Sequence, residues 1–213
     1  MAITTNDLQR LFAIIAEEMT KNRDYLCELD GAIGDGDHGI AMDTGCQAAA
    51  ASVAALDASL AEPTTVFNTA AKAFLNAVGA SSGPLYATAF MRAGAVAKGR
   101  RELSDDDFVD IFKAMAQGIE ARGKAELGEK TMLDAWKPAA DAAEAARRNG
   151  ASLASTMAAA AAAARLGCEA TSNMIAAKGR ASRLGYRALG HLDPGAVSTT
   201  LMIDAIERFC RHR

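Results

Sequence analysis

The sequence predicts an all-α protein that forms one domain. Half of its 213 residues are hydrophobic, yet only 5% are aromatic. Alanine is abundant, with an unbroken run at 158–164, and this composition favours helices over strands of β-branched residues. Apolar residues recur at helical spacing along most of the chain. A chain of this length buries a sizeable core as a single domain, which we place at residues 1–213.

The expected helices follow one another along the whole chain. The first, over 4–28, carries one apolar stripe at helical spacing, formed by Leu8, Leu11, Phe12, Ile15 and Met19. Turns that contain glycine or proline separate the others, which we place at 39–57, 64–78, 84–99, 105–121, 132–148, 152–177 and 195–210. The helix at 105–121 follows Ser104, a good N-cap residue. Eight helices joined by short turns pack as antiparallel neighbours in a bundle or a closed ring.

The charge balance and the cysteines exclude several classes of protein. A formal charge of -3 and a pI near 5.7 leave no basic surface that would hold nucleic acid. The four cysteines form no C-x-x-C pair, so we expect neither a disulfide framework nor a zinc site. Neither a signal peptide nor an apolar stretch long enough to span a membrane is visible. We therefore expect a cytoplasmic protein that binds neither nucleic acid nor membrane.

Polar residues gather in five of the turns between the expected helices. These turns are rich in glycine, serine, histidine and charged side chains, and they lie at 34–39, 79–84, 123–125, 178–180 and 191–195. Alternate turns of an up-and-down ring lie at the same end of it. We therefore expect several of the five to converge there, where loops commonly carry function.

Three aspartates near the first of these turns are candidate metal ligands. Asp30, Asp35 and Asp37 are separated by glycines that let the backbone aim all three carboxylates at one point. Each aspartate alone is better explained as a helix cap or a solvated turn residue. Taken together, oxygen ligands at this density suit Mg²⁺ or Ca²⁺, although the loop lacks the ligand spacing of an EF-hand.

Two further turns are candidate phosphate sites. The turn at 79–84 places small residues and free N–H groups at a helix N-terminus, which stabilises a phosphate, although an ordinary serine N-cap is the simpler interpretation. Neither G-x-x-x-x-G-K-[ST] nor G-x-G-x-x-G after a strand is present, so phosphates would be held mainly through metal. Arg180, beside Gly179 and Lys178, is either a phosphate clamp or a favourable charge at a helix end.

The remaining polar turn residues have plain structural interpretations. Asp193, followed by Pro194, is typical of an N-cap with proline at the first helical position. The segment 131–134 resembles a capping box with aspartate in place of glutamate. His38 and His191 are more often hydrogen-bonded turn residues than general bases. No Ser-His-Asp or Cys-His set can be assembled.

Four stretches together resemble the nucleotide-binding L subunit of bacterial dihydroxyacetone kinases, which is also found as the C-terminal domain of single-chain kinases. They are IGDGDHG (33–39), GASSGPLYAT (79–88), RGKAELGEKTMLDAW (122–136) and KGRASRLGYRALGHLDPGAVS (178–198). They occur in the family's order and extend over almost the whole chain, which makes the resemblance highly specific. It implies an eight-helix antiparallel up-and-down α-barrel with ADP or ATP and two Mg²⁺ at one end.

The resemblance also implies which residues form the site. Asp30, Asp35 and Asp37 would hold the two metal ions. The implied nucleotide contacts are His38, Gly39, Ser81, Ser82, Gly123, Met132, Arg180, Asp193, Pro194 and Gly195. Met132 would lie on the adenine, and Arg180, near the phosphates, would be the catalytic residue. The chain departs from the family pattern at Ala41, where many relatives carry asparagine, and at 79–82, where they have Gly-Gly-Ala-Ser.

The resemblance implies half of an enzyme. In this family the acceptor, dihydroxyacetone or a related ketose, is held covalently by a histidine of a separate K subunit. Phosphoryl transfer would be in line, with metal ions neutralising the developing charge. Because this chain has no K domain, we favour a bound ADP that a phosphotransferase-system protein, the M subunit, rephosphorylates; the alternative is an ATP-dependent ketose kinase subunit. A magnesium-dependent phosphohydrolase using Asp35 and Asp37 and a helical module that holds a lipid are alternatives from other classes.

Overall fold

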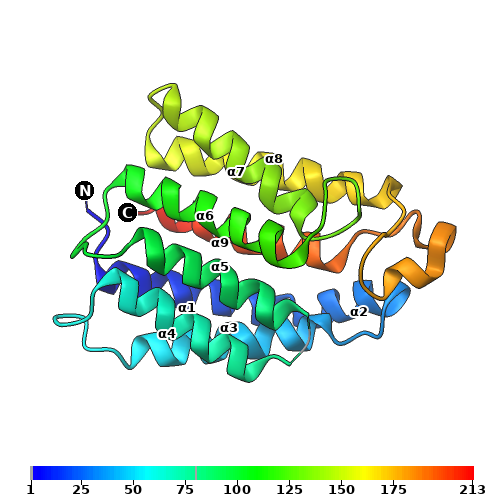
Figure 1. Ribbon diagram of the computed structural model, residues 1–213, viewed down its shortest axis with the longest axis horizontal. Helices are drawn as coiled ribbons and strands as arrows, with labels where there is room; N and C mark the ends of the chain where they lie inside the picture. Colours follow the sequence, from blue (N-terminus) through cyan, green and yellow to red (C-terminus); the bar gives the residue numbers. More distant parts are fainter. Residues whose placement is uncertain (1, 80) are drawn as a thin grey trace.

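The computed structural model describes residues 2–79 and 81–213 and is built almost entirely from helices (Figure 1). The described residues form nine α-helices: α1 (Thr5–Lys21), α2 (Arg23–Ile33), α3 (His38–Ala54), α4 (Pro63–Ala77), α5 (Ser82–Val96), α6 (Asp105–Gly123), α7 (Leu133–Arg148), α8 (Leu153–Ala170) and α9 (Pro194–Arg211). Two 3₁₀-helices, η1 (Thr171–Asn173) and η2 (Ala181–Ala188), lie between α8 and α9. The one β pairing among the described residues is an isolated bridge between Ile3 and Leu103, so the predicted all-α class is confirmed.

Helices begin where the sequence supplies caps. Ser104 and Asp107 form a reciprocal capping box at the start of α6. Asp193 accepts a hydrogen bond from the Ala196 N–H at 2.8 Å, and Pro194 is the first residue of α9. Both predicted caps are confirmed. Among the described residues, no helix is long and apolar enough to cross a membrane.

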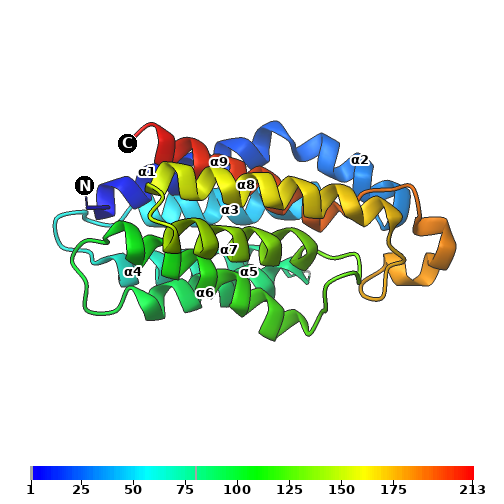
Figure 2. The same ribbon diagram turned by 90° about the horizontal axis from the view of Figure 1, so that it is seen from above.

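Eight of the α-helices close into a ring. α1 packs against α3, and from α3 to α9 each helix packs against the next. α9 packs back onto α1 and closes the ring. Successive helices of the ring run in opposite directions, as Figures 1 and 2 show from two sides. α2 extends from one end of the ring, against α3 and α9. The arrangement is the antiparallel up-and-down barrel that the family resemblance implies, and it is the closed ring of the two packings, bundle or ring, that the helix pattern left open.

The helix predicted at 4–28 is corrected by the structure to two helices. It is divided at Asn22, where α1 gives way to α2, and α2 continues to Ile33. The side-chain amide of Asn22 donates to the Glu18 carbonyl at 2.9 Å, which is also the acceptor of the Asn22 backbone N–H. Local side-chain bonds of this kind compete with helix continuation, and a stripe of apolar residues does not reveal them.

The helix predicted at 152–177 ends seven residues earlier, at Ala170. Thr171 Oγ1 donates to the Cys168 carbonyl at 2.6 Å, which satisfies one of the carbonyls left free at the end of α8. The chain then forms η1 and η2, which the sequence analysis did not predict. This segment lies over one end of the ring (Figure 1).

Aromatic side chains pack together inside the ring. They come from α1, α4 and α5 and are Phe12, Phe67, Phe74, Tyr86 and Phe90, with ring centroids 5.4 to 6.3 Å apart. Each is no more than 3% exposed. Contacts between large rings stabilise the helix walls through burial and ring geometry. They occupy interior space in which the lipid-binding hypothesis needs an apolar cavity.

Candidate functional site

The polar turns lie together at one end of the ring, opposite the chain termini (Figure 1). They surround a cavity of about 740 Å³. Its lining takes in the ends of α2 and α6, the starts of α3, α5, α7 and α9, and part of η2. The predicted convergence of turns is therefore confirmed, and this cavity is the candidate site.

Nearly all of the residues predicted for the site line this cavity. They are Asp30, Asp35, Asp37, His38, Ser81, Ser82, Gly123, Met132, Arg180, Asp193, Pro194 and Gly195. Gly39 does not line the cavity. It faces α2, and a Cβ at this position would lie 2.0 Å from the Arg23 carbonyl oxygen. Glycine at this position lets α3 begin in close contact with α2. A nucleotide contact by Gly39 stays a prediction.

The three aspartates form a compact acidic cluster where α2 ends and α3 begins. One carboxylate oxygen from each of Asp30, Asp35 and Asp37 lies within 4.8 Å of the others. Asp30 Oδ2 accepts hydrogen bonds from the N–H groups of Asp37, at 3.0 Å, and His38, at 3.2 Å. These bonds fix the Asp30 carboxylate at the centre of the loop. The three clustered carboxylates fit a hard divalent cation, because such cations prefer oxygen ligands.

Gly34 is required by the same arrangement. A Cβ at this position would lie 2.2 Å from Asp30 Oδ1, which is far closer than van der Waals contact. Any side chain here would push the Asp30 carboxylate out of the cluster. The glycine therefore allows the loop to fold tightly around the carboxylate.

Arg180 reaches the acidic cluster from the segment between η1 and α9. We call residues 174–192, which include η2, the cap segment. The Arg180 guanidinium forms an ion pair with the Asp35 carboxylate, and its side chain is 61% exposed. An exposed ion pair adds little stability and is readily exchanged. Arg180 is therefore placed beside the candidate metal ligands without being fixed there.

His38 is a hydrogen-bonded histidine at the wall of the cavity. Its Nε2 lies 2.8 Å from Ser198 Oγ, and Ser198 Oγ in turn donates to the Gly195 carbonyl. Burial lowers the pKa of His38, against the opposing effects of the Asp30 charge and the Pro194 carbonyl. The ring is thus held between α3 and α9 by its bond to Ser198, as the structural interpretation of this residue predicted.

The N-terminus of α5 opens onto the cavity. Ser81 is exposed and Ser82 is buried, and the Ser81 side chain makes no capping hydrogen bond to the helix. The simpler interpretation of this turn as a serine N-cap is therefore wrong for Ser81. The neighbouring Ala80 lies outside the described residues. Free N–H groups at this helix end suit an anion.

The start of α7 brings Met132 to the opposite side of the lining. Met132 is 9% exposed. The Asp134 carboxylate accepts hydrogen bonds from the N–H groups of Thr131, at 2.8 Å, and Gly128, at 2.6 Å. Thr131 Oγ1 accepts from the Leu133 N–H rather than from that of Asp134. The predicted capping box is thus formed in one of its two directions.

Asp193 is the most strongly perturbed acid of the site. Burial raises the pKa of its carboxyl to about 7, although the Ala196 N–H and the Lys130 ammonium favour the charged form. A carboxyl with such a pKa changes charge near neutral pH, and groups of this kind gather at functional sites.

Lys130 was missed by the sequence analysis. It lines the cavity and is 1% exposed, whereas lysines are almost never fully buried without partners. Burial lowers the pKa of its ammonium, against the charges of Asp193 and Asp134. Nothing in the local sequence distinguishes it from a lysine in a solvated turn.

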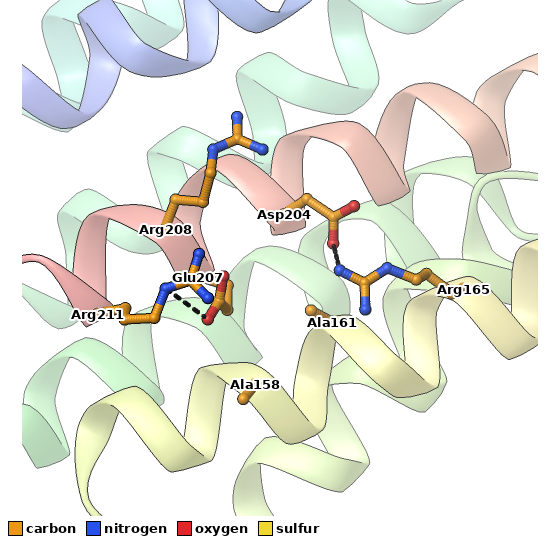
Figure 3. Close-up of a pocket in the computed structure, with 7 residues that line it drawn as sticks. All are labelled: Ala158, Ala161, Arg165, Asp204, Glu207, Arg208 and Arg211. Atoms are coloured by element: carbon orange, nitrogen blue, oxygen red, sulfur yellow. Dashed lines mark hydrogen bonds and ion pairs between the residues drawn. The ribbon is translucent and has the colours of Figure 1, made fainter.

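A second cavity lies between α8 and α9 (Figure 3), and none of its lining residues lines the candidate site. It has a volume of about 280 Å³ and contains three arginines. Arg165 pairs with Asp204 at 2.7 Å, Arg211 pairs with Glu207 at 3.6 Å, and Arg208 pairs with Glu18. Because each cation is already paired within the chain, this cavity is a weaker candidate for ligand binding.

Comparison with known proteins identifies the family. The family described as the DAK2 domain matches residues 32–208. This chain belongs to the DAK2-domain family. The family member named "PEP-dependent dihydroxyacetone kinase 2, ADP-binding subunit DhaL", from Listeria innocua, is 39% identical over 199 residues, which are 93% of this chain and 90% of the relative. The corresponding subunit of Escherichia coli is 35% identical over 86% of each chain. The resemblance stated from the motifs is thereby confirmed.

A solved DAK2-type structure has the same fold. The dihydroxyacetone kinase from C. freundii, solved in complex with AMP-PNP and Mg²⁺, superposes with a TM-score of 0.73 over 94% of this chain, at 24% identity. This chain spans about a third of that kinase chain, 33% of its length. The likeness therefore supports the helical fold of the DAK2-domain family described above.

The buried Asp193 carboxyl leads to a prediction about stability and pH. Its pKa is about 7 in the folded chain against an ordinary 3.8, so its stabilising contribution is complete below about pH 4 and is lost as the pH rises to about 7. Asparagine caps helices equally well and carries no charge to bury. As the pH rises over this range, we expect the unfolding free energy of Asp193→Asn to increase relative to that of wild type, by up to about 1.4 kcal/mol for each pH unit.

Urea unfolding of both proteins without metal or nucleotide, at several values from about pH 5 to about pH 8, measures this difference. Because all other groups are shared, subtracting the two curves isolates Asp193. Parallel curves would contradict a raised Asp193 pKa.

Proposed function

We propose that this chain is the ADP-binding subunit of a dihydroxyacetone kinase and that it acts together with a separate subunit that holds the sugar. The names of the relatives from Listeria innocua and Escherichia coli support this proposal. The observation that carries it is the meeting of the aspartate cluster, the open N-terminus of α5 and Arg180 on one cavity. Hard oxygen ligands beside a helix N-terminus and an arginine are what a metal-bound diphosphate requires.

The aspartates would hold two Mg²⁺. Three carboxylates within 4.8 Å repel one another unless a cation or protons neutralise them. When bound, the metal ions would neutralise charge on the phosphates and on the group in transfer. Asp30, fixed by two backbone N–H groups, would keep its position whether or not metal is bound.

The nucleotide would lie across the cavity from α5 to α7. The N–H groups and hydroxyls at Ser81 and Ser82 would face the phosphates, since the helix dipole favours negative charge there. The Arg180 guanidinium would reach the phosphates from the cap segment with its planar pair of donors. On the other side, Met132 would supply apolar surface to the adenine.

The acceptor sugar would have to come from a partner. Of the described residues that line the cavity, His38 is the one histidine, and its ring is bonded to Ser198 and half-buried. It is not presented as a nucleophile toward a ketone. We therefore assign the covalent binding of dihydroxyacetone, or of a related ketose, to a K subunit that docks on this end of the barrel and excludes water during transfer.

The phosphoryl donor is either ATP or a phosphotransferase-system protein. The Listeria innocua and Escherichia coli relatives are named PEP-dependent, so we propose that ADP stays bound and is rephosphorylated by a phosphotransferase-system protein. The test is to mix the chain with a K subunit and to supply either ATP or the phosphoenolpyruvate-driven system. Product formation with the second donor alone is expected. Equal activity with ATP would favour an ATP-dependent kinase, and phosphoester turnover by the isolated chain would favour a phosphohydrolase.

Docking at this end leads to a prediction for Lys124. This exposed residue follows α6 at the rim of the cavity but does not line it. We expect Lys124→Glu to lower the activity of the reconstituted pair about tenfold while ADP affinity is unchanged, because a reversed rim charge opposes association. Lys98→Glu, beyond the far end of α5, makes the same charge change away from the site. Equal effects of the two variants would contradict docking at the cavity end.

A further inference from the structure

Lys130 makes an unusual set of contacts. Its ammonium donates to the backbone carbonyls of Thr171 and His191, each at 2.5 Å. The residue is 1% exposed, and its φ of 60° lies in the left-handed region. A buried charge and a left-handed backbone at a residue other than glycine both cost free energy. Such costs persist where a residue is needed for function.

Of the two carbonyls, that of Thr171 lies just before the cap segment and that of His191 lies near its end. The Lys130 side chain therefore binds the chain at both ends of the cap segment. We call the place where the two ends of the cap segment meet its base. Two further hydrogen bonds join the chain there: the Gly190 N–H donates to the Ser172 carbonyl at 2.8 Å, and the Asp193 N–H donates to Thr171 Oγ1 at 3.0 Å. The base of the cap segment is therefore closed around the Lys130 ammonium.

Glu129, the residue before Lys130, also contacts the cap segment. The Glu129 carbonyl accepts from the Ala177 N–H at 3.1 Å, and the Glu129 carboxylate lies 3.6 Å from Lys178 Nζ. Arg180 follows two residues later and reaches Asp35 across the cavity. The turn before α7 thus anchors the cap segment on the side from which Arg180 extends.

We propose that Lys130 is a positioning residue that holds the cap segment closed at its base and so sets where Arg180 and Asp193 stand in the site. Its ammonium donates to the two backbone carbonyls that flank the segment. Deleting the ammonium removes the hydrogen bonds that tie both carbonyls to one side chain, although the Thr171 carbonyl also accepts from the Met174 N–H, and so frees the two ends of the segment to separate. The role for the cap segment stands on the contacts of this chain, whereas its consequence for ADP rests on the proposed function.

Two substitutions at Lys130 test the proposal. Lys130→Met keeps the length of the side chain and removes the donors, while Lys130→Gly also relieves the left-handed backbone. Phe67→Leu, a core change in α4, is the matched control because it lowers global stability far from the cap segment. Hydrogen exchange of 174–192 and trypsin cleavage after Lys178, Arg180, Arg183 or Arg187 report on the segment. Calorimetry with ADP and Mg²⁺ reports on the site.

Both Lys130 variants are expected to exchange and to be cleaved in the cap segment at least about tenfold faster than wild type, with the ring helices still protected. Their ADP affinity is expected to fall about tenfold or more, in the range typical of residues that orient a ligand set. Phe67→Leu should change neither at matched distance from its unfolding temperature.

Three outcomes separate the hypotheses. If wild type does not bind ADP, the proposed function fails, while the exchange data still decide the role of Lys130. If wild type binds ADP and both variants keep a protected cap segment, the positioning role is overturned. Failure of both variants to fold would assign Lys130 to the global fold and would also overturn it.

Discussion

Replacing Asp37 by asparagine is expected to lower the affinity for ADP with Mg²⁺ by at least about 100-fold, more than the loss of a residue that only orients a ligand. Asp37 isolates the ligand role best of the three aspartates. Asp30 also accepts two backbone hydrogen bonds, and Asp35 also pairs with Arg180. Asp37 stands at the N-cap of α3 but makes no capping bond through its side chain, so asparagine removes charge without removing a cap.

The measurement is calorimetry of ADP binding at fixed Mg²⁺, with Asp43→Asn as the control. Asp43 lies on α3 and bonds to Thr20, so it carries the same charge change outside the cluster. Without metal, Asp37→Asn should unfold at the same temperature as wild type or higher, since one of three neighbouring charges is gone. Unchanged ADP affinity in both Asp37→Asn and Asp35→Ala would refute the metal assignment.

The features predicted correctly from the sequence are those that depend on neighbouring residues. The N-caps at Ser104 and Asp193 each bond to the N–H group three positions later, so the local pattern determines them. Helical periodicity predicts the helices of the ring for the same reason. The division at Asn22 was missed because the apolar periodicity gives no sign of it, whereas in the structure the Asn22 side chain bonds back to Glu18.

The candidate site depends on contacts between residues that are far apart in the chain. Lys130 is buried by carbonyls that are 41 and 61 residues away in the chain, and Arg180 meets Asp35 across 145 residues. Neither contact leaves a signal in the residues next to it. Gly39 marks a different limit, because a glycine needed for close helix packing and one needed for ligand approach look the same in a sequence.

Arg180→Lys is expected to separate turnover from binding. In the reconstituted pair, turnover should fall about 100-fold, because lysine offers a point charge where a planar pair of donors would stabilise charge on the group in transfer. ADP affinity should fall much less, because lysine keeps the positive charge. The folded chain should be unaffected, since the ion pair of Arg180 with Asp35 is exposed and such pairs contribute little to stability.

Arg187→Lys is the matched control, because Arg187 is an exposed arginine of the same cap segment that does not line the cavity. Steady-state rates with saturating donor and calorimetry with ADP give the two quantities for each variant. A parallel loss of turnover and affinity in Arg180→Lys would make Arg180 a binding residue only. Full activity would leave it as a favourable charge at the mouth of the site, and the assignment of Arg180 as catalytic would be wrong.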